Sequence, residues 1–322
     1  MNNLMRNLTT AEFNLYKNIL KLTQNGILEL MGSYLDKYYG TKNVYKHQSF
    51  VVALGDIPIC LCAHADTVFP SPPKNIFYDR EENVIWSPEG CGHDDRAGVF
   101  GIIQVIGRGY RPHIIISTDE EIGCIGAMEL ARYKCPFKDL KYIIQLDRAG
   151  ANDCVFYQND NKEFEKYIES FGFKTAIGSF TDIVEYCPSW NVSGVNLSIG
   201  YVNEHTYIEH LFVDCYLNTI DKVIKMLENP PSKRYKFKQK KFTNVAFNNK
   251  LKPGTTCTCD GCKQQVDEDD LYPIKSYISN HKRFCIDCMM DSVAWCPLCN
   301  EAFEIRDKNQ ELCDDCLKLK GE

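Results

Sequence analysis

Two apolar patterns alternate along residues 1–231. Short runs rich in Val, Ile and Leu predict buried strands, whereas longer stretches with apolar residues three or four positions apart predict amphipathic helices. The predicted strands are residues 49–55, 58–66, 111–121, 140–147, 154–158 and 192–201. The predicted helices, which follow a helix pair at the N-terminus, are residues 97–109, 125–135, 161–173 and 209–229. This alternation predicts an α/β domain in which helices are layered on a central sheet.

The N-terminal helix pair begins with Thr9 and Glu12 at the spacing of a capping box. Lys, Asn, Gln and Glu repeatedly interrupt its apolar positions, unlike the continuous apolar stretch of a signal peptide or a membrane span. We therefore expect a cytoplasmic protein with no membrane partner. A formal net charge of −6 over 322 residues is too modest to indicate a nucleic acid or a membrane surface as partner.

Pro230 and Pro231 end the last predicted helix, and the composition changes after them. Residues 232–256 interleave Lys and Arg with Tyr and Phe, lack periodicity and end close to a Pro-Gly turn. Such a segment can bind single-stranded nucleic acid, but we favour a solvated linker that lies partly on the preceding domain. The predicted organisation is a large domain of residues 1–231, a basic linker of residues 232–256 and a C-terminal module of residues 257–322.

The 17 cysteines are distributed unevenly, because nine of them lie between Cys257 and Cys316, mostly as Cys-x-x-Cys pairs. Without a secretory signal, thiols or metal ligands are favoured over disulfides in a chain of this length. The predicted ligands of two structural zinc ions are Cys259, Cys262, Cys285, Cys288, Cys296, Cys299, Cys313 and Cys316. Adjacent pairs would share an ion as in successive zinc ribbons, or the first and third pairs would do so in a RING-like cross-brace. The intervals slightly favour ribbons.

So small a module has little apolar core, and bound zinc would supply much of its folding free energy. Acidic stretches such as residues 267–270 argue against a strongly basic nucleic-acid surface. We favour contact with a protein partner, or delivery of substrate, as the role of the module.

Imidazole and carboxylate side chains stand at the ends of several predicted strands and in a glycine-rich turn before a helix. They are His64, Asp66, Asp94, Asp95, Asp119, Glu120, Glu121, Asp147 and His205. In open α/β sheets, ligands bind at the edge formed by the C-terminal ends of the strands. So many carboxylates converge only around cations, and this set of ligands suits zinc or a similar divalent ion.

The motifs HADTV, GHDDRAG, STDEEIGCIGA, QLD and NEHTYIE occur in this order across residues 50–228. They resemble the motifs of the dizinc peptidase superfamily that includes peptidase T, glutamate carboxypeptidase, aminoacylase and the zinc aminopeptidases. The resemblance implies a three-layer α/β/α domain with a central mixed sheet that hydrolyses an amide or peptide bond. It implies that His64 and Asp147 bind one zinc ion, or cobalt or manganese in its place. Glu121 and His205 would bind the second ion, and Asp94 would bridge the two.

The same resemblance implies that Asp66 holds the ring of His64 and that Glu120 is the general base. Glu120 would activate a water between the two zinc ions and then protonate the leaving amine. The peptide bond after the bridging aspartate is commonly cis in this superfamily, so we expect a cis bond between Asp94 and Asp95.

Asp147 and His205 are separated by 58 positions (205 minus 147), too few for the lid and dimerisation domain of peptidase T and glutamate carboxypeptidase. A compact, aminopeptidase-like layout is expected. Substrate contacts follow from position alone: Arg148 would bind a carboxylate with its planar fork, and Asp182 would accept an amine or orient a ligand. His93 would approach the metals or the substrate. A structural role is the alternative for each of these three.

Three functions stay open at this point. The first is a peptidase, of exopeptidase or dipeptidase type, whose polarity as aminopeptidase or carboxypeptidase is undecided. The second is a deacylase that hydrolyses an N-acyl amide, and the third is a non-catalytic zinc-binding interaction protein. The complete set of ligands and the intact Glu120 favour an enzyme.

Overall fold

The computed structural model describes residues 6–178 and 180–240, and further along the chain residues 256–259, 262–267, 271–274, 282–285, 288, 293–295 and 302–304. The chain divides into two compact units, Met1–Lys241 and Phe242–Glu322. Within the described residues, no helix is long and apolar enough to cross a membrane.

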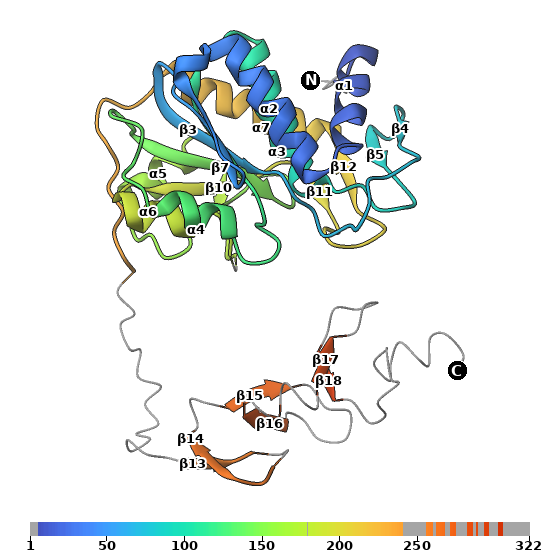
Figure 1. Ribbon diagram of the computed structural model, residues 1–322, viewed down its shortest axis with the longest axis vertical. Coiled ribbons are helices and arrows are strands. Elements are labelled where there is room, and N and C mark those ends of the chain that lie inside the picture. The colour runs from blue at the N-terminus through green and yellow to red at the C-terminus, as the bar shows by residue number, and fades with distance from the viewer. Residues whose placement is uncertain are drawn as a thin grey trace. The chain divides into compact units, whose positions relative to one another are not determined.

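A mixed sheet of eight strands forms the centre of the first unit, in the order β1-β2-β6-β3-β7-β10-β8-β9 (Figure 1). Its four inner strands are parallel to one another: β6 (Pro112–Ser117), β3 (Ile57–His64), β7 (Tyr142–Arg148) and β10 (Gly194–Ser198). The outer strands are β1 (Val44–Lys46), β2 (Phe50–Ala53), β8 (Asp153–Val155) and β9 (Lys174–Thr175). Inner parallel strands are covered on both faces, which is why their sequences are almost continuously apolar. The predicted mixed α/β fold with a central sheet is confirmed.

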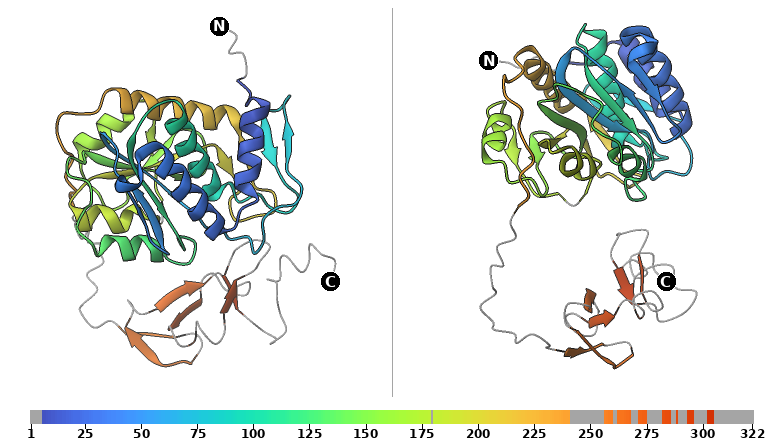
Figure 2. Two further views of the ribbon diagram at one scale, coloured as in Figure 1. Left: turned by 45° about the horizontal axis from the view of Figure 1, so that its top comes forward. Right: turned by 60° about the vertical axis from the view of Figure 1, so that its left-hand side comes forward.

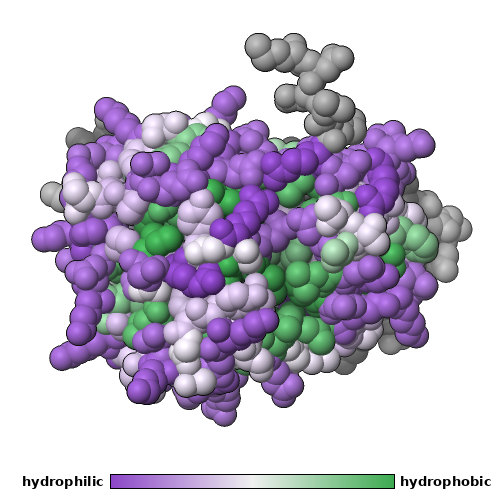
Figure 3. Space-filling model, turned by 90° about the horizontal axis from the view of Figure 1, so that it is seen from above, coloured by the Kyte–Doolittle hydropathy of each residue, from purple (hydrophilic) through white to green (hydrophobic). Residues whose placement is uncertain are grey.

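Helices cover both faces of this sheet (Figures 1 and 2). One core includes residues of α1 (Thr10–Leu20), α2 (Gln24–Tyr39), α3 (His93–Gly107), α5 (Lys162–Glu169) and α7 (Val213–Glu228). The other core includes residues of α4 (Ile125–Ala131) and α6 (Ile183–Trp190). Strand β3 divides its side chains between them: Leu61 belongs to the first core and Cys60 and Cys62 to the second, because successive side chains of a strand point to opposite faces. Hydrophilic side chains cover most of the molecular face seen in Figure 3.

The predicted capping box is confirmed at the start of α1. Thr9 Oγ1 accepts a hydrogen bond from the backbone N–H of Glu12, and the Glu12 carboxylate accepts one from the backbone N–H of Thr9. These bonds satisfy donors that the first helical turn leaves unpaired.

Several elements of the structure were not predicted from the sequence. Helix α6 was not predicted, because Pro188 lies inside it and proline ordinarily ends a helix. A second sheet of four short strands, β11 (Tyr201–Val202), β12 (His210–Phe212), β5 (Val84–Trp86) and β4 (Phe77–Asp79), was also not predicted. Between β10 and β11 the chain turns at Gly200, whose φ is 98° and where a Cβ would lie 2.7 Å from the Tyr216 nitrogen. Strands this short carry too few residues to show a period of two.

Residues 232–240 pack on the first unit. The backbone N–H of Tyr235 donates to the Lys141 carbonyl, and the Tyr235 carbonyl accepts from the N–H of Ser193. The Tyr235 ring is buried and contacts the rings of Phe164 and Tyr167. The first part of the segment predicted as a linker is therefore part of the first unit, whereas residues 241–255 lie outside the described residues.

The described part of the second unit contains three two-stranded antiparallel sheets. They pair β13 (Thr256–Thr258) with β14 (Gln265–Asp267), β15 (Leu271–Ile274) with β16 (Lys282–Cys285) and β17 (Val293–Trp295) with β18 (Ala302–Glu304). Isolated two-stranded ribbons are marginally stable in water.

Candidate metal centre

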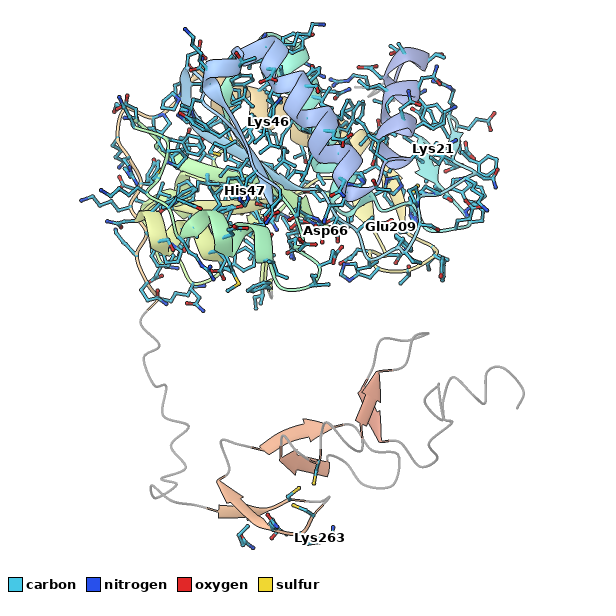
Figure 4. The ribbon with its side chains drawn as sticks, viewed as in Figure 1. Lys21, Lys46, His47, Asp66, Glu209 and Lys263 are labelled. Carbon is cyan, nitrogen blue, oxygen red and sulfur yellow. The ribbon has the colours of Figure 1, made fainter. Side chains whose placement is uncertain are left out.

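The candidate ligands meet at one edge of the central sheet. His64 is the last residue of β3, and Asp147 lies at the end of the neighbouring parallel strand β7. Glu121 follows β6, Asp94 lies in the first turn of α3, and His205 lies between β11 and β12. Parallel strands bring their C-terminal ends to the same edge, so residues far apart in sequence converge there. Asp66 and Glu209, both labelled in Figure 4, lie beside this edge.

Two clusters of potential ligand atoms share Asp94. His64, Asp94 and Asp147 form the first cluster, and Asp94, Glu121 and His205 form the second. Oδ1 of Asp94 lies 3.1 Å from Nε2 of His64, which is 3.4 Å from Oδ1 of Asp147. Oδ2 of Asp94 lies 3.3 Å from Nε2 of His205, which is 3.0 Å from Oε2 of Glu121. The two oxygens of Asp94 therefore face different histidines, as the oxygens of a bridging carboxylate do.

This geometry fits two divalent cations. Ligand atoms at zinc bond lengths in a tetrahedral site are about 3.3–3.5 Å apart, close to the separations of 3.0–3.4 Å between the imidazole nitrogens and carboxylate oxygens. Oε1 of Glu121 is also buried and has no hydrogen-bond partner among the described residues. A buried carboxylate oxygen without a donor is costly unless a cation lies beside it.

The carboxylates at the site oppose one another's ionisation. Burial, together with the charges of Asp147 and Asp182, raises the pKa of Glu120 to about 9, although His64 opposes this shift. Burial and the charge of Asp94 raise the pKa of Asp147 to about 7. A nearby cation favours the ionised form of a carboxylate. The arrangement therefore has an excess of negative charge that divalent cations would balance.

The carboxylate of Asp66 is hydrogen-bonded to several residues around the first cluster. Its Oδ1 lies 3.2 Å from Nδ1 of His64, which leaves Nε2 of that ring directed at Asp94. Its carboxylate also accepts the backbone N–H groups of Glu120 and Glu121 at 3.1 and 3.0 Å. Burial alone would raise the pKa of Asp66, but His64 and the two N–H groups lower it overall. An ionised Asp66 thus orients both His64 and the Glu120–Glu121 pair.

Glu120 belongs to neither ligand cluster. Its Oε2 lies 3.9 Å from Nε2 of His64, and its Oε1 accepts a hydrogen bond from the Cys124 thiol at 3.7 Å. The side chain lines a cavity of about 310 Å³ together with Asp94, Asp147 and His205. Glu120 is therefore positioned to exchange a proton with a molecule in this cavity.

The peptide bond between Asp94 and Asp95 is cis, as predicted. The carboxylate of Asp95 is buried and accepts the backbone N–H groups of His64 and Gly98 at 3.1 and 2.9 Å. Asp95 thus joins the end of β3 to the start of α3, so that His64 and Asp94 are held in one arrangement.

Glu209 also belongs to the site, although no role was predicted for it from the sequence. Its side chain is completely buried, and its carboxylate accepts the backbone N–H groups of His93 and Asp94 at 3.0 and 3.1 Å. Burial raises the pKa of Glu209 to about 7 despite these hydrogen bonds. Glu209 therefore holds the backbone from which Asp94 extends. Its position four residues after His205, in the same motif, was the available signal.

Three further residues hold Asp147, and none was assigned this role from the sequence. Thr181 donates its hydroxyl to Oδ2 of Asp147 at 2.6 Å, and Tyr201 donates to Oδ1 at 3.2 Å. The side chain of Asn196 bonds both the backbone N–H and the carbonyl of Asp147. Asp147 is thus restrained through its carboxylate and its backbone.

Of Arg148, Asp182 and His93, the three residues placed near the substrate from position alone, only Arg148 lines the cavity. Asp182 is completely buried and accepts the hydroxyl of Ser117, so the structure places it away from the cavity surface. His93 is also buried, between the Tyr16 hydroxyl at 2.6 Å and the Ile85 carbonyl at 3.0 Å. Both ring nitrogens of His93 are occupied away from the two clusters.

In the second unit, Cys259, Cys262 and Cys288 bring their sulfur atoms within 4.8 Å of one another. This places the first Cys-x-x-Cys pair beside a member of the second pair, which is the adjacent pairing. The side chain of Cys285 lies outside the described residues, as do Cys296, Cys299, Cys313 and Cys316.

No family model matches this chain, and no curated protein sequence matches it. Solved structures do match. An aminopeptidase from Bacillus cereus ATCC 10987 is 14% identical, with a TM-score of 0.52, over 67% of this chain and 97% of that chain. The chain shares the fold of this peptidase.

Two further structures have the same fold. A tripeptidase from Staphylococcus aureus is 13% identical, with a TM-score of 0.52, over 67% of this chain and 97% of that chain. A TET aminopeptidase from a marine sediment Thaumarchaeota archaeon is 12% identical, with a TM-score of 0.55, over 70% of this chain and 98% of that chain. At these identities, similarity establishes the fold, and the chemistry has to be argued from the site.

Proposed function

We propose that this protein is a metallopeptidase that hydrolyses the peptide bond of a short peptide at a centre of two divalent metal ions, with zinc the favoured metal. The observation that carries this proposal is the pair of ligand clusters that share Asp94, with Glu120 beside them and outside both. The fold of known aminopeptidases supports the same function.

In this proposal, His64 and Asp147 would hold one ion, Glu121 and His205 would hold the other, and Asp94 would supply a ligand to each. Bound divalent ions supply Lewis acidity, which acidifies water and stabilises the negative charge that develops on a carbonyl oxygen. The restraints on Asp94 and Asp147 described above keep the ligands in place before a metal binds. A site prepared in this way avoids reorganisation during the reaction.

Glu120 performs the proton transfers. As general base it accepts a proton from the attacking water, and as general acid it then returns that proton to the nitrogen of the leaving amine. These two proton transfers require one glutamate that binds metal and a neighbouring glutamate that does not. Glu121 and Glu120 divide these tasks, because Asp66 holds both of their backbone N–H groups and so fixes their relative orientation.

The proposed function is tested by hydrolysis assays of the purified full-length chain at measured metal content. Dipeptides, tripeptides and aminoacyl anilides are compared with N-acetyl amino acids. We expect peptide hydrolysis that a chelator abolishes and added zinc, cobalt or manganese restores. Hydrolysis of N-acetyl amino acids alone would convert the proposal to a deacylase. Absence of amide hydrolysis by fully metal-loaded protein would refute it.

We also propose that Cys259, Cys262, Cys285 and Cys288 bind one structural zinc ion and that the remaining two Cys-x-x-Cys pairs bind another. The proximity of Cys259, Cys262 and Cys288 supports this pairing. Tetrahedral thiolate sites of this kind contribute directly to folding.

Replacing Cys288 by Ser should therefore release one equivalent of zinc, because three thiolates hold the ion much more weakly than four. The measurement is elemental analysis of the dialysed protein. Cys215→Ser, in helix α7 of the first unit, is the matched control and should keep every zinc ion. Equal zinc content in the two variants would contradict the proposed site.

A further inference from the structure

We propose that Arg148 forms a carboxylate subsite beside the metal centre, so that the substrates are short peptides with a free carboxylate close to the scissile bond. The inference rests on the proposed function and specifies the substrate class of the same site.

Arg148 is placed at the centre by its position in the sheet. It is the last residue of β7 and directly follows the candidate ligand Asp147. Its side chain lines the same cavity as Glu120 and His205. Among the described residues that line this cavity, Arg148 is the one side chain with a permanent positive charge.

The guanidinium of Arg148 keeps donors available. Nη2 donates to the carbonyl of Ile177 at 3.2 Å. Nε is buried and has no hydrogen-bond partner within the described part of the chain. Nε has almost no accessible surface, so a ligand reaches the guanidinium through its Nη atoms. The contacts with Ile177 and Asp153 are made by Nη2, which leaves Nη1 for a carboxylate in the cavity, and the planar fork of Arg matches the two oxygens of a carboxylate.

A structural ion pair explains Arg148 less well. Nη2 lies 3.5 Å from Oδ2 of Asp153, whose side chain is 46% exposed, compared with 23% for Arg148. An ion pair with an exposed carboxylate contributes little to stability. The pair with Asp153 therefore explains little of the position of Arg148.

The wall around Arg148 is closely packed. A Cβ at Gly178 would lie 3.0 Å from Cγ1 of Val155, 3.3 Å from the ring of Tyr157 and 3.4 Å from Nη1 of Arg148. Tyr157 lines the same cavity, and its hydroxyl accepts a hydrogen bond from Asn196 at 2.9 Å. Arg148 therefore lies beside Tyr157, which is bonded to Asn196, the residue that also holds the backbone of Asp147.

The size of the cavity limits the ligand. A volume of about 310 Å³ is at the lower end of the range for small-molecule sites. With a scissile carbonyl at the metal centre, a carboxylate bound to Arg148 belongs to a nearby part of the same small molecule. Two sources have this chemistry: the C-terminal carboxylate of a short peptide and an acidic side chain next to the scissile bond.

The test measures binding, so that it does not depend on turnover. Three probes are titrated calorimetrically into the zinc-loaded full-length Glu120→Gln protein: Ala-Ala, its C-terminal amide and the amide of Ala-Asp. We expect at least one carboxylate-bearing probe to bind more tightly than Ala-Ala amide, on the order of 10- to 100-fold, the strength of a charge-assisted hydrogen bond. Preference for Ala-Ala identifies the C-terminal carboxylate, and preference for Ala-Asp amide identifies the acidic side chain.

Each further substitution is made in the Glu120→Gln protein. Arg148→Gln should abolish the preference for a carboxylate-bearing probe, Arg148→Lys should keep part of it, and Asp153→Asn should keep nearly all of it. Circular dichroism checks that each variant is folded. Equal binding of all three probes to the parent protein, or a preference that survives Arg148→Gln, would overturn the carboxylate subsite. The proposed peptidase function is tested separately, because it would be refuted by a lack of hydrolysis by the metal-loaded wild-type chain and not by a binding measurement.

Discussion

Replacing Glu120 by Gln is expected to lower kcat about 10²–10⁴-fold, the usual contribution of a general acid–base, while the metal content stays unchanged. Gln has the size of Glu but cannot accept a proton from water. Because Glu120 belongs to neither ligand cluster, its replacement should leave both metal sites intact. The measurements are steady-state kinetics on the best peptide of the panel and elemental analysis of the same sample.

Glu129→Gln is the matched control for this prediction. Glu129 lies on helix α4, where its carboxylate is 3.6 Å from His47, and it does not line the cavity. Its replacement should leave kcat unchanged. A Glu120→Gln protein with wild-type kcat would show that another group transfers the proton.

Replacing Asp94 by Ala is expected to remove both catalytic metal ions and reduce peptidase activity to the background rate. The two oxygens of Asp94 face His64 and His205 separately, so one substitution takes a ligand from each cluster. His205→Ala takes a ligand from the second cluster only. Elemental analysis should therefore find two ions lost from Asp94→Ala and one ion lost from His205→Ala.

Asp139→Ala removes an exposed aspartate outside both clusters and should retain the full metal content. The zinc bound by the second unit should be the same in all of these proteins. Loss of a single ion from Asp94→Ala would refute the bridging role, although it would leave the other ligands in place.

The candidate ligands could be predicted from the sequence because their positions follow from local patterns. Each apolar strand of the parallel sheet ends in polar residues, and parallel strands carry these ends to one edge. His64, Glu121 and Asp147 come from three such strands, which the structure places side by side in the order β6, β3, β7. Their separation along the chain did not matter, because the sheet topology brings them together.

The supporting contacts could not be predicted in this way. Glu209 reaches the backbone of Asp94 across 115 positions, and Thr181 reaches Asp147 across 34. The motif around His205 includes Glu209 but does not show which group its carboxylate contacts, and the local pattern around Thr181 does not distinguish it from other polar residues. Their roles depend on how the loops and the second sheet pack against the central one.

For Arg148 and Asp182, the sequence could not decide which of the two faces the cavity, and the tertiary structure does. As charged residues near predicted ligands, both were equally plausible substrate contacts. In the folded chain, Arg148 lines the cavity with donors unpaired, whereas Asp182 is completely buried and accepts the Ser117 hydroxyl.

The sequence by itself determined the α/β class, the strand ends and the chemical types of the ligands, since these depend on residue identity and short-range periodicity. Only the tertiary structure decided that Arg148 lines the cavity whereas Asp182 does not, and that residues such as Glu209 and Thr181 hold the candidate ligands. These properties depend on distances between segments that are remote in sequence, and packing alone sets such distances.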